Sequence, residues 1–155
     1  MLVSSDAEKK NQNNFSFIGL ADTGGQMPVT YKIDPSKNLT SFVVYGEISA
    51  EDILSAIRPI YENPDLLPTL NVLWDYREGV PDPLIRDEDI EKIASYLSNH
   101  ATKRAGGKTA IVARADLEFD ISKKYEFFTR LKGLSITVEV FRSLGEAMLW
   151  LDERD

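Results

Sequence analysis

From Val29 onward the chain alternates between two hydrophobic periods, and this alternation constrains the fold more than any other feature. Short segments rich in β-branched and aromatic residues predict strands, and the segments between them repeat apolar residues with the i, i+3, i+4, i+7 spacing of an amphipathic helix. The strand segments are VTYKI, LTSFVVYGEI, residues 70–75, KTAIVA and ITVEVF. The order is therefore ββαβαβαβα, which predicts an α/β protein with an N-terminal antiparallel hairpin and a mixed sheet covered by helices.

Capping residues predict where three of the four helices begin. Ser49 with Asp52 and Ser143 with Glu146 have the spacing of a capping box, which pairs each side chain with the backbone of the other residue. Asp87 is expected to cap the second helix. These positions fix the starts of the first, second and last helices.

The third helix is expected from Phe119 to Lys132, with Gly133 ending it in the left-handed conformation. Phe119 and Phe127 fall outside its apolar stripe. An exposed aromatic pair most often packs under a neighbouring loop, but one that borders other apolar surface indicates a partner or dimer interface. Pro59 is expected to kink or shorten the first helix. The side chains predicted to face the core are Ile53, Leu54, Ile57, Ile60, Tyr61, Ile90, Ile93, Ala94, Leu97, Ile121, Tyr125, Phe128, Leu131, Leu144, Ala147, Met148 and Leu151.

The chain of 155 residues has the length of one domain. Residues 1–14 are almost all polar, so we expect a disordered tail followed by a single domain over residues 15–155. Residues 15–20 could add a short further strand ahead of the hairpin.

Composition excludes several classes of function. The net charge of −7, without a basic cluster, argues against nucleic acid as a partner. There is no cysteine, and His100 is the sole histidine, so we expect no metal site and no cofactor. No apolar run approaches the ~18 residues of a membrane span, and no secretory signal is recognisable, which predicts a cytoplasmic protein.

Polar residues follow two neighbouring strands, and they form the candidate ligand-binding site. Asp75 and Arg77 end the third predicted strand, and Arg114 and Asp116 end the fourth. Ligands of parallel sheets bind at the carboxyl ends of the strands, so these four residues could orient a ligand's head group. The interpretation that we favour is two ion pairs that tie the adjacent loops together. Asp75 and Glu78 could form an acid–base pair, but no catalytic constellation is recognisable.

Four segments together resemble the SpoIIAA-like family, which has the STAS-type fold of bacterial anti-sigma-factor antagonists and of CRAL-TRIO relatives. They are VVYGEIS, VLWDYR, KTAIVA and VEVFRSLGEAMLWL. The resemblance spans Val29 to Leu151 and implies a small bacterial regulatory protein that is not an enzyme.

One feature of the regulatory relatives is missing. They are switched by a phosphorylated serine at the start of the helix that follows the third strand, but no serine or threonine lies between Thr69 and Ser95, so no phosphoacceptor can be assigned. Asp87, Glu88 and Asp89 occupy this region instead. They could replace the phosphate charge permanently, or they could simply stabilise the positive end of a helix dipole.

Two functions are therefore expected. The first is a non-enzymatic regulatory or protein–protein interaction module that binds an unknown protein partner or a second copy of itself. The alternative is a carrier or sensor for a small apolar or amphipathic, lipid-like ligand. A fully packed interior would favour the first, and a continuous apolar pocket of about 300 Å³ or more near Asp75 would favour the second.

Overall fold

The computed structural model describes residues 18–20, 28–62, 69–81, 85–100, 104–114, 116–133 and 135–153. The predicted tail, residues 1–14, lies outside the described residues.

A six-stranded mixed sheet forms the centre of the molecule, with each strand hydrogen-bonded to the strands before and after it in sequence. The first two pairings are antiparallel and the other three are parallel. The predicted hairpin and mixed sheet are therefore confirmed, and β1 is the additional strand that residues 15–20 allowed. The strands are β1 (Ile18–Leu20), β2 (Val29–Asp34), β3 (Leu39–Ile48), β4 (Asn71–Pro81), β5 (Lys108–Val112) and β6 (Thr137–Phe141).

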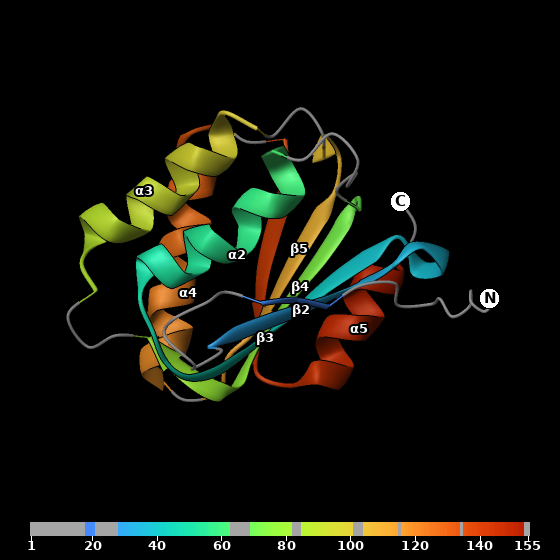
Figure 1. Ribbon diagram of the computed structural model, residues 1–155, viewed down its shortest axis with the longest axis horizontal. Helices are drawn as coiled ribbons and strands as arrows, with labels where there is room; N and C mark the ends of the chain where they lie inside the picture. Colours follow the sequence, from blue (N-terminus) through green and yellow to red (C-terminus); the bar gives the residue numbers. More distant parts are fainter. Residues whose placement is uncertain are drawn as a thin grey trace.

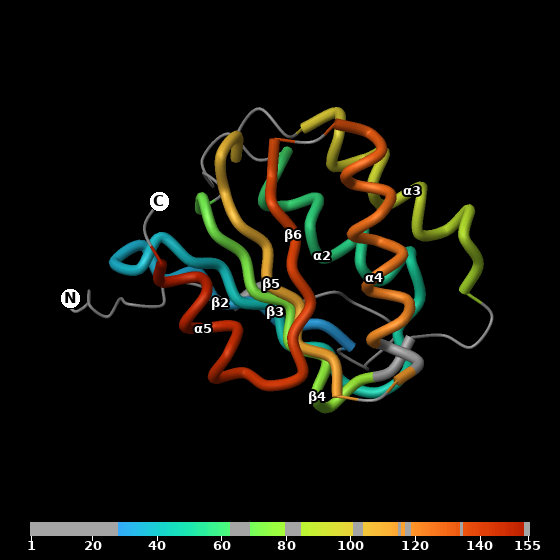
Figure 2. The backbone as a smooth tube through the Cα atoms, turned by 180° about the vertical axis from the view of Figure 1, so that it is seen from behind, coloured from blue at the N-terminus to red at the C-terminus, as the bar shows by residue number. Residues whose placement is uncertain are grey.

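In the described part of the chain, four α-helices cover the two faces of the sheet unequally (Figures 1 and 2). They are α2 (Ala50–Glu62), α3 (Asp87–Ser98), α4 (Asp116–Leu131) and α5 (Leu144–Asp152), and a 3₁₀ turn, η2 (Pro35–Lys37), joins β2 to β3. Helices α2, α3 and α4 connect parallel strands that advance in one direction across the sheet. Because such crossovers are right-handed, all three helices lie on the same face. Helix α5 follows the last strand and packs on the opposite face.

Strand alternation divides the buried side chains between two cores. The larger core lies under α2, α3 and α4, and Phe42 of β3, Trp74 of β4 and Ile111 of β5 belong to it. The smaller core lies under α5, where Leu73 and Val112 pack with Leu151. Neighbouring residues of one strand thus serve opposite faces of the sheet.

Strand β4 continues well beyond its expected end. It was predicted over residues 70–75, but it runs from Asn71 to Pro81. The pairing of β3 with β4 shifts register after Val43 and then continues from Tyr45 to Ile48. The bulge lets the charged residues remain in the ladder, so Asp75 and Arg77 lie within the strand and do not follow it.

The expected helix ends are mostly confirmed. The Ser49 Oγ accepts a hydrogen bond from the Asp52 amide, and the Asp52 carboxylate accepts one from the Ser49 amide. Helix α4 is followed by Gly133 at φ +69°, the left-handed value expected of a stop. Pro59 neither ends nor shortens α2, which continues to Glu62.

Three expectations about the helices are wrong. Helix α4 begins at Asp116 and not at Phe119, so Asp116 is a helical residue and does not end the strand before it. Arg86 is the N-cap of α3, because its amide donates to the Asp89 carboxylate at 3.0 Å, and Asp87 is the first helical residue. Leu131 was predicted to face the core but is 67% exposed. It is the last residue of α4, and a helical period gives the direction of a side chain without showing that another element lies there.

Candidate functional site

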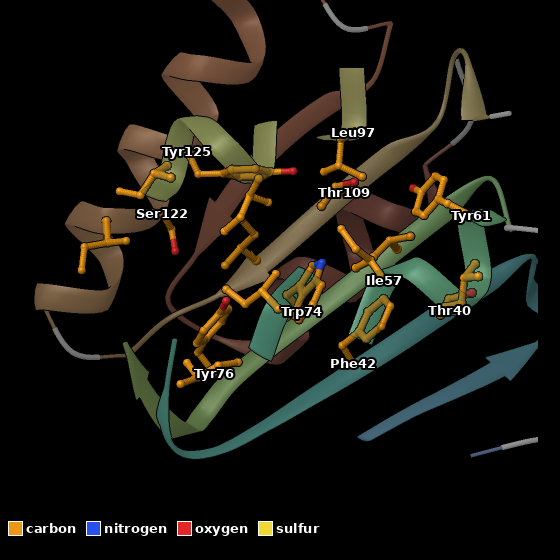
Figure 3. Close-up of a pocket in the computed structure, with 18 of the residues that line it drawn as sticks. Thr40, Phe42, Ile57, Tyr61, Trp74, Tyr76, Leu97, Thr109, Ser122 and Tyr125 are labelled. Atoms are coloured by element: carbon orange, nitrogen blue, oxygen red, sulfur yellow. The ribbon is translucent and has the colours of Figure 1, made fainter. Parts of the chain in front are cut away.

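A partly open, mainly apolar cavity lies between the sheet and helices α2, α3 and α4 (Figure 3). Strands β3, β4 and β5 form its floor, and α2, α3 and α4 form its walls. The lining residues that the structure describes are mostly apolar, and Arg104 is the only charged residue among them. The lining consists of Thr40, Phe42, Ile48, Ile53, Ile57, Ile60, Tyr61, Thr69, Val72, Trp74, Tyr76, Ile85, Ile90, Ile93, Leu97, Arg104, Thr109, Ile111, Ile121, Ser122 and Tyr125.

Aromatic rings form part of the floor. The rings of Phe42 and Trp74 are stacked, with centroids 4.1 Å apart and planes inclined by 8°. Tyr76 continues this row, its ring centroid 6.2 Å from that of Trp74. Since Trp74 and Tyr76 are two residues apart in β4, strand alternation brings both rings to the cavity face. They offer a flat aromatic surface to a ligand.

The cavity is small. Its volume is about 70 Å³. This is about half of the ~150 Å³ of an engineered apolar cavity that binds benzene. The interior is therefore not fully packed, but it is also smaller than the pocket of about 300 Å³ that a drug-sized or lipid-like ligand requires.

A buried guanidinium forms one polar part of the lining. The Arg104 Nε donates to the Leu70 carbonyl at 3.0 Å, and Nη2 donates to the Lys108 carbonyl at 2.8 Å and to the Thr109 Oγ1 at 3.0 Å. Nη1 donates to the Tyr61 hydroxyl at 3.1 Å. These four acceptors hold the guanidinium between α2, the start of β4 and β5, and all four are uncharged.

Two threonines line the same region. The hydroxyls of Thr40 and Thr69 are 2.6 Å apart, and Thr69 donates its proton to the Asn71 carbonyl at 2.9 Å. Thr40 must therefore be the donor within the pair. This hydrogen bond ties β3 to the start of β4.

The hydroxyls of Tyr76 and Ser122 lie at the end of the cavity opposite Tyr61 and Thr40, and the ring of Tyr125 reaches from α4 toward the middle of the cavity (Figure 3). None of the hydroxyls of Tyr76, Ser122 and Tyr125 forms a hydrogen bond with another described residue. Burial raises the pKa of the Tyr76 phenol. Burial is also the largest cause of the raised pKa of Tyr125. Both phenols therefore stay protonated at neutral pH and can donate hydrogen bonds to a ligand.

The structure brings two of the four predicted site residues together. The Arg77 Nε and Nη2 donate to the Asp75 carboxylate at 2.9 and 2.8 Å, and the Arg77 amide donates to it at 3.0 Å. Although burial raises the pKa of Asp75, the hydrogen bonds and the charge of Arg77 lower it below its ordinary value. By strand alternation this pair lies on the sheet face opposite the cavity, since Trp74 and Tyr76 face inward.

Arg114 and Asp116 are tied elsewhere. The Arg142 guanidinium donates to the Arg114 carbonyl at 2.8 Å and to the Asp116 carboxylate at 3.0 Å. No ion pair between described residues joins Arg114 or Asp116 to the Asp75–Arg77 pair. The four residues of the predicted ligand-binding site therefore form two separate clusters, and none of them lines the cavity. A ligand-binding role for them stays a prediction.

The acidic residues at the start of α3 have structural partners. The Asp89 carboxylate caps the helix, and the Asp87 carboxylate accepts a hydrogen bond from the Lys124 Nζ of α4 at 2.9 Å. His100 Nδ1 lies 2.8 Å from the Tyr96 carbonyl, just beyond the C-terminal end of this helix. No group of three or more potential metal ligands comes together in the described part of the chain.

Sequence reasoning missed the two residues that give the cavity its chemistry. Arg104 lies in the segment KRAGGK, where a cation is ordinarily solvated, and no local pattern distinguishes it. Tyr76 could have been found, because it alternates with Asp75 and Arg77 in a strand and must face the other way. The error in the end of β4 concealed that alternation.

No protein-family model and no curated protein matches the chain. Among solved structures, it is similar to an uncharacterized protein from the DUF3478 family with a SpoIIAA-like fold, from Shewanella loihica PV-4. The two share 18% sequence identity and a TM-score of 0.44, over 87% of this chain and 92% of that chain. This description names the fold that the sequence resemblance implied. No helix in the described part of the chain is long and apolar enough to cross a membrane.

Proposed function

We propose that the protein is a non-enzymatic module that binds a small amphipathic ligand between its sheet and helices α2, α3 and α4. The observation that carries this proposal is the cavity, which combines apolar walls with the hydroxyls of Tyr76, Ser122 and Tyr125, none of which has a described hydrogen-bond partner. Binding sites for small molecules commonly have this composition, with a few polar groups that orient the ligand within an apolar enclosure.

The size of the cavity narrows the ligand. A cavity of about 70 Å³ is smaller than one that binds benzene, so a single ring or a branched apolar group of similar size is the largest group that it can admit, and neighbouring side chains must move to admit it. The stacked rings of Phe42 and Trp74 suit a flat ligand, since offset stacking contributes about 0.5–1.5 kcal/mol beyond the burial of area. A long acyl chain would not fit, so the proposal is narrower than the lipid-like carrier expected from the sequence.

The test is an NMR titration of the ¹⁵N-labelled protein with a panel of one-ring compounds. Binding is monitored through the indole N–H signals of the two tryptophans. Trp74 lines the cavity, whereas Trp150 packs in the core on the other face. We expect at least one compound to shift the Trp74 signal and to leave the Trp150 signal unchanged.

A filled variant and a matched control complete the experiment. Ile57→Phe places a ring into the cavity and should abolish the Trp74 response. Leu149→Phe adds a similar group at a position that is 73% exposed and should leave it unchanged. A panel without any Trp74 response, or an Ile57→Phe variant that binds as well as the original protein, would count against the proposal.

One observation favours the interaction module as a second candidate. Phe127 and Leu131 lie one turn apart on α4 and are 55% and 67% exposed. An apolar strip of this kind would contact a second copy of the chain more readily than solvent. Light scattering over a range of protein concentrations should then show dimers. The double variant Phe127→Ser, Leu131→Ser should be monomeric under the same conditions, and an original protein that is monomeric at every concentration would reject this candidate.

A further inference from the structure

Arg104 carries a buried positive charge that no described residue neutralises. The residue is 2% exposed, and none of the ion pairs between described residues includes it. Arginine keeps its charge in proteins, and buried charges are ordinarily paired because their desolvation is costly. Its neutral acceptors satisfy hydrogen bonds but leave the charge uncompensated.

The guanidinium also retains a donor. Four of its five N–H groups have acceptors among the described residues, and the second hydrogen of Nη1 has none. The Thr109 hydroxyl accepts from Nη2, so its own proton remains for another acceptor. Both groups belong to residues that line the cavity. This part of the lining therefore offers donors and positive charge, without a carboxylate among the described lining residues.

We infer that the ligand of this cavity is an anion, a small aromatic or similarly compact carboxylate whose charged group binds Arg104 while its ring lies against Phe42 and Trp74. The inference rests on the proposed function and specifies its ligand class. A carboxylate supplies the missing countercharge and accepts the free hydrogen of Nη1. The apolar walls receive the ring, and the phenols of Tyr76 and Tyr125 can bond to polar substituents on it.

Benzoate and benzamide test the charge directly, because they share a ring and a planar head group and differ in charge. Each is titrated into the ¹⁵N-labelled protein, with the Trp74 indole signal as the measure of occupancy and Trp150 as the internal control. We expect benzoate to bind at least about tenfold more tightly than benzamide, as a hydrogen bond to a charged group predicts.

Two variants distinguish Arg104 from general electrostatics. Arg104→Gln should remove the preference for benzoate. Lys108→Gln removes a nearby cation whose Nζ bonds to the carbonyls of Trp150 and Glu153, and it should leave the preference unchanged. If circular dichroism shows that Arg104→Gln does not fold, the ratio of the benzoate and benzamide dissociation constants is compared between the original protein and Lys108→Gln. A preference for benzoate that is the same in both proteins supports the inference, and equal affinities in the original protein overturn it.

The outcomes separate this inference from the proposed function. Equal binding of the two probes at Trp74 overturns the anion inference and leaves the proposed ligand site intact. A preference that Lys108→Gln abolishes overturns the role of Arg104, because general electrostatics would then account for it. If neither probe shifts Trp74 while another one-ring compound does, the inference fails alone, and if no compound shifts it, the proposed function fails too.

Discussion

Replacing Gly107 by alanine should strongly destabilise the protein, because the position has no room for a side chain. A Cβ at this residue would lie 2.0 Å from the Leu70 carbonyl oxygen and 3.0 Å from the Arg104 carbonyl oxygen. Ordinary contacts between carbon and oxygen begin near 3.3 Å, so the backbone at the start of β4 would have to retreat by about 1.3 Å. Neither contact is with a flexible side chain that could rotate away.

This movement of the backbone would disturb the hydrogen bonds that hold Arg104 at the cavity. The Leu70 carbonyl accepts from Arg104 Nε, the Gly107 amide donates to the Arg104 carbonyl at 2.8 Å, and the Gly107 carbonyl accepts from the Thr137 amide at 3.0 Å. Overpacking costs about 1–3 kcal/mol, and each weakened hydrogen bond adds about 1 kcal/mol. We therefore expect a loss of about 3 kcal/mol or more, which corresponds to a fall in Tm of roughly 6–12 °C for a chain of this length.

Urea denaturation followed by tryptophan fluorescence measures this loss. Gly145→Ala is the matched control, because its Cβ would meet no atom within 4 Å and it lies within helix α5. Alanine in a helix is more favourable than glycine, so this variant should be unchanged or more stable by up to about 1 kcal/mol. A Gly107→Ala variant within about 1 kcal/mol of the original protein would refute the reasoning from close backbone approach.

The remaining predictions concern charge and the N-terminus. Asp75→Asn should cost about 1.5–3 kcal/mol at pH 7, because it removes charge-assisted hydrogen bonds from Arg77. The folded pKa of Asp75 lies below its ordinary value, so the stability that the ionised carboxylate contributes is present above the unfolded pKa of about 3.9 and is lost as the pH falls through the folded pKa. In urea titrations, the difference in the free energy of unfolding between the two proteins should therefore narrow below about pH 4. A difference that stays constant with pH would contradict this prediction. Arg114→Ala should change the free energy of unfolding by less than about 0.5 kcal/mol, since the side chain is exposed. Deleting residues 1–14 should lower Tm by less than about 5 °C in calorimetry, and a larger fall would show that the segment packs on the body.

Local patterns predicted the elements of this fold well because strands and helices have different hydrophobic periods. The alternation around KTAIVA and the spacing of Ile90, Ile93 and Leu97 each allow a single interpretation. The full length of β4 could not be predicted in the same way. Its second half carries charged residues and a glycine, and it is a strand because β3 extends beside it after a bulge. That pairing depends on two segments that are distant in the sequence, and the residue pattern of neither segment alone indicates it.

The candidate site was harder to predict than the fold. The predicted ligand-binding site required Asp75 and Arg114 to lie close together, but the carboxylate of Asp75 accepts its hydrogen bonds from Arg77 of the same strand. The burial of Arg104 depends on acceptors from α2, the start of β4 and β5. A cavity is a small difference between the volume that these elements enclose and the volume that their side chains fill, and no single segment encodes it.

The uninterrupted strand order has a consequence for how the protein is made. In this sheet no strand is inserted between two neighbours that are already paired, because each strand from β2 to β6 is added beside its predecessor. The sheet can therefore grow from one edge as the chain leaves the ribosome, and each crossover helix docks when its second strand arrives. The parallel pairing of β4 with β5 is the slowest step to expect on this route, because its partners Val72 and Thr109 lie further apart in the sequence than the partners of the other two parallel pairs.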